Sequence, residues 1–293
     1  MTNHLGIFTD LHWGLGALHR ELAAALRTRG WVVDLIDWAD VDSKTPAADV
    51  FMTLPSTVWA LVQRGIPRNR IILVAHLEED LKRFDGDLDD YAGYAVVSDG
   101  MVASSIAMGF RRVPFVVRQG IDVDHYRCPP PTSLRRLGYA TVVSRQAMGH
   151  EIKRGYLAER IAKDLGLQLV VTDALSTYED LPKFFAGVDA VICTSLLEGA
   201  GRPALEAAAC GRPCIATPTG HHPRLATEGC CRIGPIDEND FVTEASRWLL
   251  EMMDPSVLRG RSSVVRICAE AYRRWDVVLP DWERLLDVAL LAS

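Results

Sequence analysis

The chain of 293 residues has no long apolar run and no excess of positive charge. None of its apolar stretches approaches the roughly 20 residues of a membrane-spanning helix, so we expect no such helix. The formal net charge of -6 argues against a broad surface for nucleic acid, although a local basic patch stays open. Low-complexity tracts and blocks of like charge are also missing, so the composition indicates folded domains.

Cysteine occurs without the spacing of a metal or redox motif. The seven cysteines include no Cys-x-x-Cys pair, and several stand in apolar runs, as buried free thiols do. The first ten residues, "MTNHLGIFTD", lack the basic segment and long apolar stretch of a secretory leader. We therefore expect a cytoplasmic, reducing location.

What the sequence has is a regular alternation of short apolar runs and amphipathic segments. Strands separated by helices are typical of a parallel α/β sheet with crossover helices. The strands expected in the first half cover residues 4–9, 31–36, 49–54, 70–76, 94–98 and 113–117. Those expected in the second half cover residues 139–144, 167–172, 189–195 and 213–217.

Three consecutive prolines, "CPPPT", interrupt this alternation. Prolines remove backbone donors and favour extended geometry, so residues 127–134 are expected to form a linker. The halves on either side predict an N-terminal domain over 1–126 and a second domain over 135–275. Ligands of doubly wound sheets bind beyond the carboxyl ends of the strands. We therefore expect the two domains to face a cleft that holds the site.

One segment carries the chemistry. Glu198 follows the apolar run 189–195, at the expected carboxyl end of a strand, and Gly199 and Gly201 permit close backbone approach. Pro203 fits the first position of a helix, whose free N–H groups favour an anion. Glu206 lies about one turn further along. Two glutamates eight positions apart can also be a surface coincidence, but carboxylate, helix start and carboxylate match a sugar–phosphate–ribose ligand.

The segment "SLLEGAGRPALEAAACGRPCIAT" resembles the EX7E segment of retaining GT-B glycosyltransferases of the GT4-type family, the glycosyl transferases group 1. Similar likenesses occur in "LGALHRELAAALRTRGWVVDLI" and in "VVRQGIDVDHY", where Gln119 replaces the usual Asn. The resemblance implies a GT-B architecture of two Rossmann-like domains, with a C-terminal helix, 276–293, packing back on the first. It implies transfer of a sugar, with retention, from a UDP- or GDP-sugar to an acceptor hydroxyl.

The resemblance also assigns roles to individual residues. Glu198 would position the transferred sugar, Glu206 the ribose, and Arg145 and Lys153 the donor diphosphate, whose developing charge must be stabilised. The turn and helix start would add further donor contacts, from Gly199, Ala200, Gly201 and Arg202.

The first domain contributes a loop and a histidine on this interpretation. Gly14 and Gly16 lie between the first strand and helix, in a loop that approaches the donor phosphates in relatives; a tight turn is the alternative. His76 follows the apolar run "IILVA", where relatives often carry a histidine near the reacting sugar. A structural strand-end histidine is the alternative there.

Two segments depart from the family pattern. Asp85 and Asp87 resemble the DxD metal site of a different glycosyltransferase fold, but no strand precedes them, so we expect a solvated loop. We therefore expect no metal and no other cofactor. His221 and His222 stand where relatives have Gly-Gly-x-x-Glu, which leaves the donor and acceptor unassigned; a His-His metal site would lack a third ligand nearby.

The acceptor is expected on the first domain, and a small molecule or a glycan end is the first choice. A nucleobase of DNA or a lipid, bound through Arg111, Arg112 and Arg118, is the second. Two functions without sugar transfer stay open as well. A sugar-nucleotide epimerase would carry Asp-Ser-Gly-Gly in place of "TSLLEGAG", and an inactive nucleotide-sugar-binding relative would lack turnover.

Overall fold

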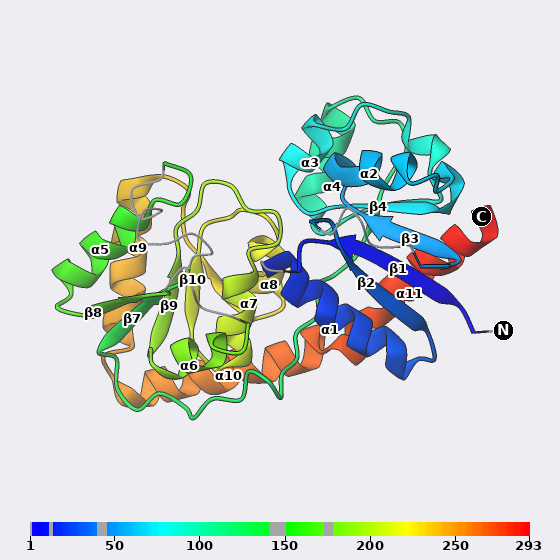
Figure 1. Cartoon of the computed structure of the whole chain (residues 1–293). Coiled ribbons are helices and arrows are strands. Elements are labelled where there is room, and N and C mark those ends of the chain that lie inside the picture. The colour runs from blue at the N-terminus through cyan, green and yellow to red at the C-terminus, as the bar shows by residue number, and fades with distance from the viewer. Residues whose placement is uncertain (1, 12–13, 40–45, 141–150, 173–177) are drawn as a thin grey trace. The chain divides into compact units, whose positions relative to one another are not determined.

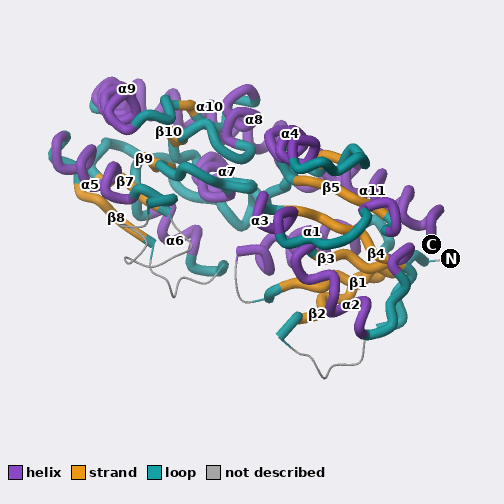
Figure 2. The backbone as a smooth tube through the Cα atoms, turned by 90° about the horizontal axis from the view of Figure 1, so that it is seen from above, coloured by secondary structure: helices purple, strands orange, loops and turns teal. Residues whose placement is uncertain are grey.

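The computed structural model describes residues 2–11, 14–39, 46–140, 151–172 and 178–293. Two compact units make up the chain: Met1–Gly120 with Trp275–Ser293, and Ile121–Arg274. Each unit is a parallel sheet with helices on both faces (Figures 1 and 2). The prediction of two doubly wound α/β units is confirmed.

The first unit has a six-stranded sheet in the order β2-β1-β3-β4-β5-β6, and all of its pairs are parallel. Because β2 and β3 lie on opposite sides of β1, the strand order reverses at β1, where α/β sheets bind ligands. The strands are β1 (His4–Thr9), β2 (Val32–Asp37), β3 (Val50–Thr53), β4 (Ile71–Ala75), β5 (Gly93–Val96) and β6 (Phe115–Val116).

Helices α1 (Gly14–Thr28) and α11 (Trp275–Ala292) cover one face of this sheet (Figure 1). The other face carries α2 (Val58–Gln63), α3 (Glu78–Lys82) and α4 (Asp99–Ala107) (Figure 1). The connections also contain the 3₁₀ helices η1 (Pro55–Thr57), η2 (Arg68–Arg70) and η3 (Leu88–Asp90).

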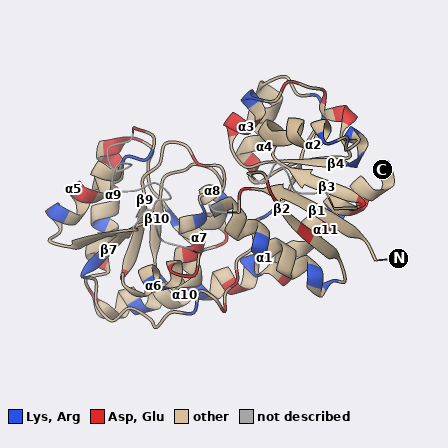
Figure 3. Ribbon diagram, in the orientation of Figure 1, with Lys and Arg blue, Asp and Glu red and all other residues tan. Residues whose placement is uncertain are grey.

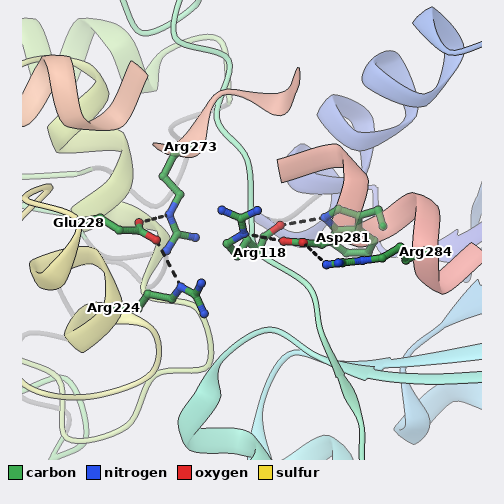
Figure 4. Close-up of polar contacts among 7 residues, drawn as sticks. Arg118, Arg224, Glu228, Arg273, Asp281 and Arg284 are labelled. Atoms are coloured by element: carbon green, nitrogen blue, oxygen red, sulfur yellow. Dashed lines mark hydrogen bonds and ion pairs between the residues drawn. The ribbon is translucent and has the colours of Figure 1, made fainter. Parts of the chain in front are cut away.

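Helix α11 belongs to the first unit although it ends the chain. The Trp275 indole donates to Glu21 at 2.7 Å, and the Trp282 indole donates to the Arg118 carbonyl at 2.8 Å. Asp281 accepts from Arg118 and from Arg284, at 2.5 and 2.7 Å (Figure 4). These contacts join the last helix to α1 and to the segment after β6.

The second unit has a five-stranded parallel sheet in the order β11-β10-β9-β7-β8, so its order reverses at β7. The strands are β7 (Arg136–Tyr139), β8 (Gln168–Val171), β9 (Ala190–Cys193), β10 (Cys214–Ala216) and β11 (Arg232–Ile233). The helices are α5 (Gly155–Asp164), α6 (Leu181–Ala186), α7 (Arg202–Ala209), α8 (His222–Thr227), α9 (Glu238–Glu251) and α10 (Pro255–Arg273).

Strand β9 contributes to the core on both faces of this sheet, because successive side chains of a strand point to opposite faces. Val191 and Cys193 pack with α7 and α10, whereas Ala190 and Ile192 pack with α5 and α9. A strand buried on both faces explains the uninterrupted apolar run in the sequence.

Two boundaries differ from the sequence-based expectation. Strand β7 begins at Arg136, three residues before the predicted 139–144, because the Arg135 and Arg136 amides donate to the Asp189 carboxylate at 2.9 and 2.8 Å. The segment 127–134 belongs to the second unit, where the Pro129 carbonyl accepts from buried Arg212 at 2.8 Å.

Acidic and basic residues are interspersed over the helices of each unit (Figure 3). Pairs within one helix are typical, such as Arg160 with Asp164 in α5 and Arg247 with Glu244 in α9. Among the helices of the described residues, none combines the length and the apolarity that crossing a bilayer requires.

Candidate functional site

A small pocket lies in the second unit at the carboxyl ends of β7 and β9, where the strand order reverses. It holds an ion pair, a glycine-dependent turn and a histidine. Its lining comprises Tyr139, Ala140, Lys153, Cys193, Ser195, Glu198, Gly201, Pro203 and His222. Residues singled out from the sequence therefore converge on the position where α/β sheets bind ligands.

Lys153 and Glu198 form an ion pair in this pocket. The Lys153 Nζ lies 2.6 Å from Glu198 Oε1, with side chains 24% and 18% exposed. The Lys153 carbonyl accepts from the Tyr139 and Thr194 hydroxyls at 2.8 and 2.7 Å. Burial raises the pKa of Tyr139 to about 12, so it stays a hydrogen-bond donor. An anion entering the pocket must compete with Glu198 for the ammonium group.

Arg154 fixes the backbone next to Lys153. It adopts a φ of 50°, in the left-handed region that is unfavourable for a side chain of this size. Its buried guanidinium donates to the Thr194 and Ile236 carbonyls at 2.8 and 2.9 Å. These bonds hold a strained residue between Lys153 and α5.

Helix α7 begins at a turn that only glycine fits. Gly201 has a φ of 58°, and a Cβ there would lie 2.1 Å from the His222 Nε2. Gly220 has a φ of 56°, and a Cβ there would lie 2.6 Å from the Gly199 carbonyl oxygen. The turn 198–201 and the loop at 220 are therefore packed backbone against backbone beside the first turn of α7.

Glu206 lies deeper than the pocket lining, on the buried part of α7. Its side chain is 5% exposed, and its Oε1 accepts from Arg202 Nε at 2.8 Å and from the Tyr126 hydroxyl at 3.0 Å. Arg202, predicted as a donor contact, is thus the partner of Glu206 four residues away. Tyr126 was not anticipated from the sequence, since a single tyrosine gives no signal of such a bond.

His221 and His222 are both buried and neutral. The pKa of His221 lies well below its usual value because of burial and then the nearby charge of Arg273. Burial also lowers the pKa of His222, whose Nδ1 lies 2.9 Å from the Thr217 carbonyl oxygen. Neither ring nitrogen of His221 has a hydrogen-bond partner within the part of the chain that is described.

Glu228 balances the positive charge beside this histidine pair. It accepts from Arg273 at 2.6 Å and from Arg224 at 3.3 Å (Figure 4). Arg224 occupies the position where the resemblance leads one to expect a glutamate. The carboxylate that the family segment supplies is therefore replaced here by an arginine bound to Glu228.

In the first unit, His76 follows β4 and meets a second histidine. Its ring and that of His19 pack edge to face with centroids 5.6 Å apart, and His19 Nδ1 lies 2.7 Å from the Thr9 hydroxyl. Burial lowers the pKa of His76 to about 4, and burial lowers that of His19 as well. Both imidazoles are neutral at pH 7. His19 was missed because a lone histidine on the buried face of an amphipathic helix is usually structural.

Asp80 orders the turn that carries His76. Its Oδ2 accepts from the His76 and Leu77 amides at 3.0 and 2.9 Å, and its Oδ1 accepts from Ser56 at 3.0 Å. Burial raises its pKa despite these bonds. Asp80 is itself buried.

Of the two glycines predicted to approach the donor, Gly16 has a structural reason to be small. Gly14 begins α1, and a Cβ at Gly16 would lie 2.4 Å from the Asp10 carbonyl oxygen. Gly16 therefore lets the helix pack on the loop that follows β1. Their role towards a donor stays a prediction. Arg145 lies outside the described residues.

In the first unit, Asp87 of the predicted solvated loop and Arg112 of the three arginines considered for the acceptor form hydrogen bonds within the protein. Asp87 is exposed and caps η3 by accepting from the Asp89 amide. Arg112 donates to the Leu88 and Tyr91 carbonyls, at 2.8 and 2.7 Å. Over the described ranges, no group of three His, Cys, Asp or Glu residues is placed to hold a metal ion.

Residues 142–254 match the family described as Glycosyl transferases group 1. No curated protein sequence matched the chain. The structure is similar to that of sucrose-phosphate synthase (tll1590) from Thermosynechococcus elongatus, with a TM-score of 0.72 at 15% identity over 99% of this chain and 100% of that one.

Two further solved structures are similar over nearly their whole length. Anabaena Alr3699/HepE in complex with UDP-glucose gives a TM-score of 0.68 at 14% identity, over 97% of this chain and 99% of that one. A glycosyltransferase from Rickettsia africae ESF-5 gives 0.68 at 11% identity, over 98% of both chains. At such identities the likeness shows the fold, which is GT-B-like with two parallel α/β sheets.

Proposed function

We propose that this chain, a glycosyltransferase whose residues 142–254 match the Glycosyl transferases group 1 family, transfers a sugar from a nucleotide-sugar donor to an acceptor hydroxyl. A UDP-sugar is the first donor to test, since the similar Anabaena HepE was solved with UDP-glucose. Retention of the anomeric configuration is part of the proposal.

The observation that carries the proposal is the Lys153–Glu198 ion pair next to the start of α7. A cation beside the positive end of a helix dipole suits a diphosphate, and a carboxylate beside them suits sugar hydroxyls. On this proposal the donor diphosphate binds the ammonium group of Lys153. The ion pair with Glu198 then breaks, and the Glu198 carboxylate accepts hydrogen bonds from the sugar.

The proposed reaction is attack on the same face of the sugar that the diphosphate leaves. The bond from the anomeric carbon to the phosphate oxygen breaks, the acceptor oxygen bonds to that carbon, and the departing phosphate takes the acceptor proton. Lys153, Arg145 and the start of α7 stabilise the charge that grows on the leaving group. His76 stays a catalytic candidate of the first unit, as a neutral donor or acceptor.

The test is calorimetric titration of UDP- and GDP-sugars, followed by incubation with acceptors and NMR of the product. Saturable donor binding and an acceptor-dependent product of unchanged anomeric configuration are expected. Inverted product would refute retention. A donor isomerised without an acceptor would favour an epimerase, and binding without turnover on any acceptor would favour an inactive relative.

We also propose that catalysis needs no metal ion, because Lys153 and the helix start supply the positive potential that a DxD enzyme draws from a cation. Activity should survive dialysis against EDTA. Complete loss, restored by Mn²⁺ or Mg²⁺, would return Asp85 and Asp87 to consideration.

For the acceptor we propose a small molecule or a glycan end, bound by the first unit. Arg112 and Arg118 are engaged within that unit, by carbonyls and by Asp281, which disfavours a phosphate-binding patch. Binding to duplex DNA or anionic vesicles at two salt concentrations tests this, because phosphate recognition weakens steeply with salt. Tight, salt-sensitive binding would replace the small acceptor with a nucleic acid or a membrane lipid.

A further inference from the structure

Two cysteines distant in sequence meet in the second unit. The sulfur atoms of Cys128 and Cys210 lie 3.0 Å apart. Cys210 is the residue after α7, and Cys128 lies two residues beyond Tyr126, on the segment that reaches Glu206. A disulfide has its sulfurs about 2.05 Å apart, so an approach of ~1 Å would join them.

A cavity opens onto this cysteine pair. It has a volume of about 280 Å³, and both sulfur-bearing residues line it. Cys128 is half-buried, and it lies at the wall of this cavity. The remaining lining is polar and partly basic: Arg127, Pro130, Gly211, Ser262, Ser263, Arg266 and Glu270.

The surroundings favour the thiolate form of Cys128. Its hydrogen bond with Cys210, and then the charges of Arg212 and Arg266, lower the pKa of Cys128 to about 7 against the opposing effect of burial. Burial and the neighbouring sulfur raise the pKa of Cys210. Of the two sulfurs, Cys128 is thus the one that ionises first, close to neutral pH, and Cys210 is the protonated thiol beside it.

We propose that Cys128 and Cys210 form a reversible thiol–disulfide site that reacts with a small anionic disulfide of the glutathione type. The Cys128 sulfur attacks one sulfur of oxidised glutathione, whose S–S bond breaks, and one glutathione leaves as its thiolate. Cys210 then loses its proton to solvent, attacks the Cys128 sulfur and expels the second glutathione. Two protein thiols are oxidised, and one glutathione disulfide is reduced to two thiols.

This inference goes beyond sugar transfer and does not depend on it. The disulfide would tie the C-terminal end of α7 to the segment that carries Tyr126 and so to the hydrogen bond on Glu206. A second close pair in this unit, Cys193 and Cys214, differs because its sulfurs are 3.8 Å apart and buried in the core. That pair serves as an internal comparison.

The experiment is incubation of the full reduced chain with oxidised glutathione from pH 6 to 9, alkylation of the remaining thiols, and peptide mass mapping. We expect a linked Cys128–Cys210 peptide that dithiothreitol abolishes, with a rate that reaches half its maximum near pH 7. Cys210→Ser should stop at glutathione bound to Cys128, and Cys128→Ser should abolish the reaction. Cys268→Ser, at another half-buried cysteine, should change nothing.

If a serine variant fails to fold, the peptide map of the wild-type chain alone tests the proposal. Absence of the linked peptide, or reaction of Cys128 no faster than Cys268, would overturn the proposal. Linkage of Cys193 to Cys214 in preference to Cys128 and Cys210 would overturn it as well.

Discussion

At the scale of single residues, two neighbouring side chains hold the Glu206 carboxylate in place. Tyr126 and Arg202 both donate to its Oε1, so the other oxygen keeps a defined direction. Glu206→Ala should weaken donor binding at least ~10-fold, because hydrogen bonds to a charged group are worth about 1.5–3 kcal/mol. Tyr126→Phe should weaken it less, since the carboxylate remains. Calorimetry with the donor measures both.

Circular dichroism and the Tm of each variant serve as the controls for this pair. An unchanged donor affinity in folded Glu206→Ala would contradict the assigned ribose contact. Loss confined to Tyr126→Phe would mean that the tyrosine, and not the glutamate, touches the donor.

Glu198 should have opposite effects on product binding and on turnover. In Glu198→Gln the charge of Lys153 is no longer neutralised across 2.6 Å, so the nucleoside diphosphate should bind several-fold more tightly. Transfer should fall, because the sugar loses its carboxylate. Titration with UDP and initial rates of transfer check the two effects; weaker UDP binding would show that Glu198 does not compete for Lys153.

The sequence led to individual residues only where several signals coincided. Glu198, Gly201 and Pro203 could be assigned to one pocket because strand, glycine turn and helix start follow one another without a gap. Tyr126 and Tyr139 could not, since their hydroxyls bond to groups 80 and 14 residues away. Contacts over such separations are set by tertiary packing and leave no local pattern.

At the scale of elements, Gly201, the residue before α7, has no room for a side chain. Gly201→Ala adds a left-handed alanine, which costs about 1–2 kcal/mol, and a methyl group that collides with His222, which costs about 1–3 kcal/mol more. Urea unfolding should show the sum of both. Gly166→Ala is the matched control, because φ is 65° there and nothing lies within 4 Å of the added Cβ.

In Gly166→Ala the free energy of unfolding should fall only by the cost of the left-handed alanine. Equal destabilisation at both glycines would mean that His222 moves aside without cost. Recovery of stability in Gly201→Ala/His222→Ala would assign the difference to the collision.

The sequence predicted which segments form helices and strands better than it predicted where each of them begins and ends. Alternating apolar runs and amphipathic segments predicted the two parallel sheets, since the central strands of each core are buried on both faces. The predicted start of β7 was wrong because it depends on amide bonds to Asp189, more than fifty residues further along the chain. Such a bond follows from the position of β9 beside β7 and has no signal near residue 136.

At the scale of the whole molecule, four buried histidines make stability depend on pH. The folded-state pKa values of His19, His76, His221 and His222 are lowered, that of His76 to about 4. Below the unfolded value of about 6.5 the unfolded chain binds more protons, so the free energy of unfolding should fall as the pH drops from 6.5 towards 4. Urea unfolding at several pH values measures this.

His76→Gln removes one of these protons and should make the decline less steep. The raised pKa of Asp80 acts in the opposite direction, but only in the range where carboxyl groups titrate. A free energy of unfolding that stays constant from pH 6.5 to 5 would contradict the burial of neutral imidazoles.

The first unit is made of two separate stretches of chain, Met1–Gly120 and Trp275–Ser293. During synthesis its sheet leaves the ribosome long before α11, one of the two helices that cover one of its faces. A Cβ at Gly120 would lie 2.4 Å from Trp275, so that helix fills space left vacant by a residue made some 150 positions earlier. While the whole second unit is translated, this face of the nascent sheet is therefore covered by α1 alone, and the apolar surface that α11 later buries stays exposed to solvent.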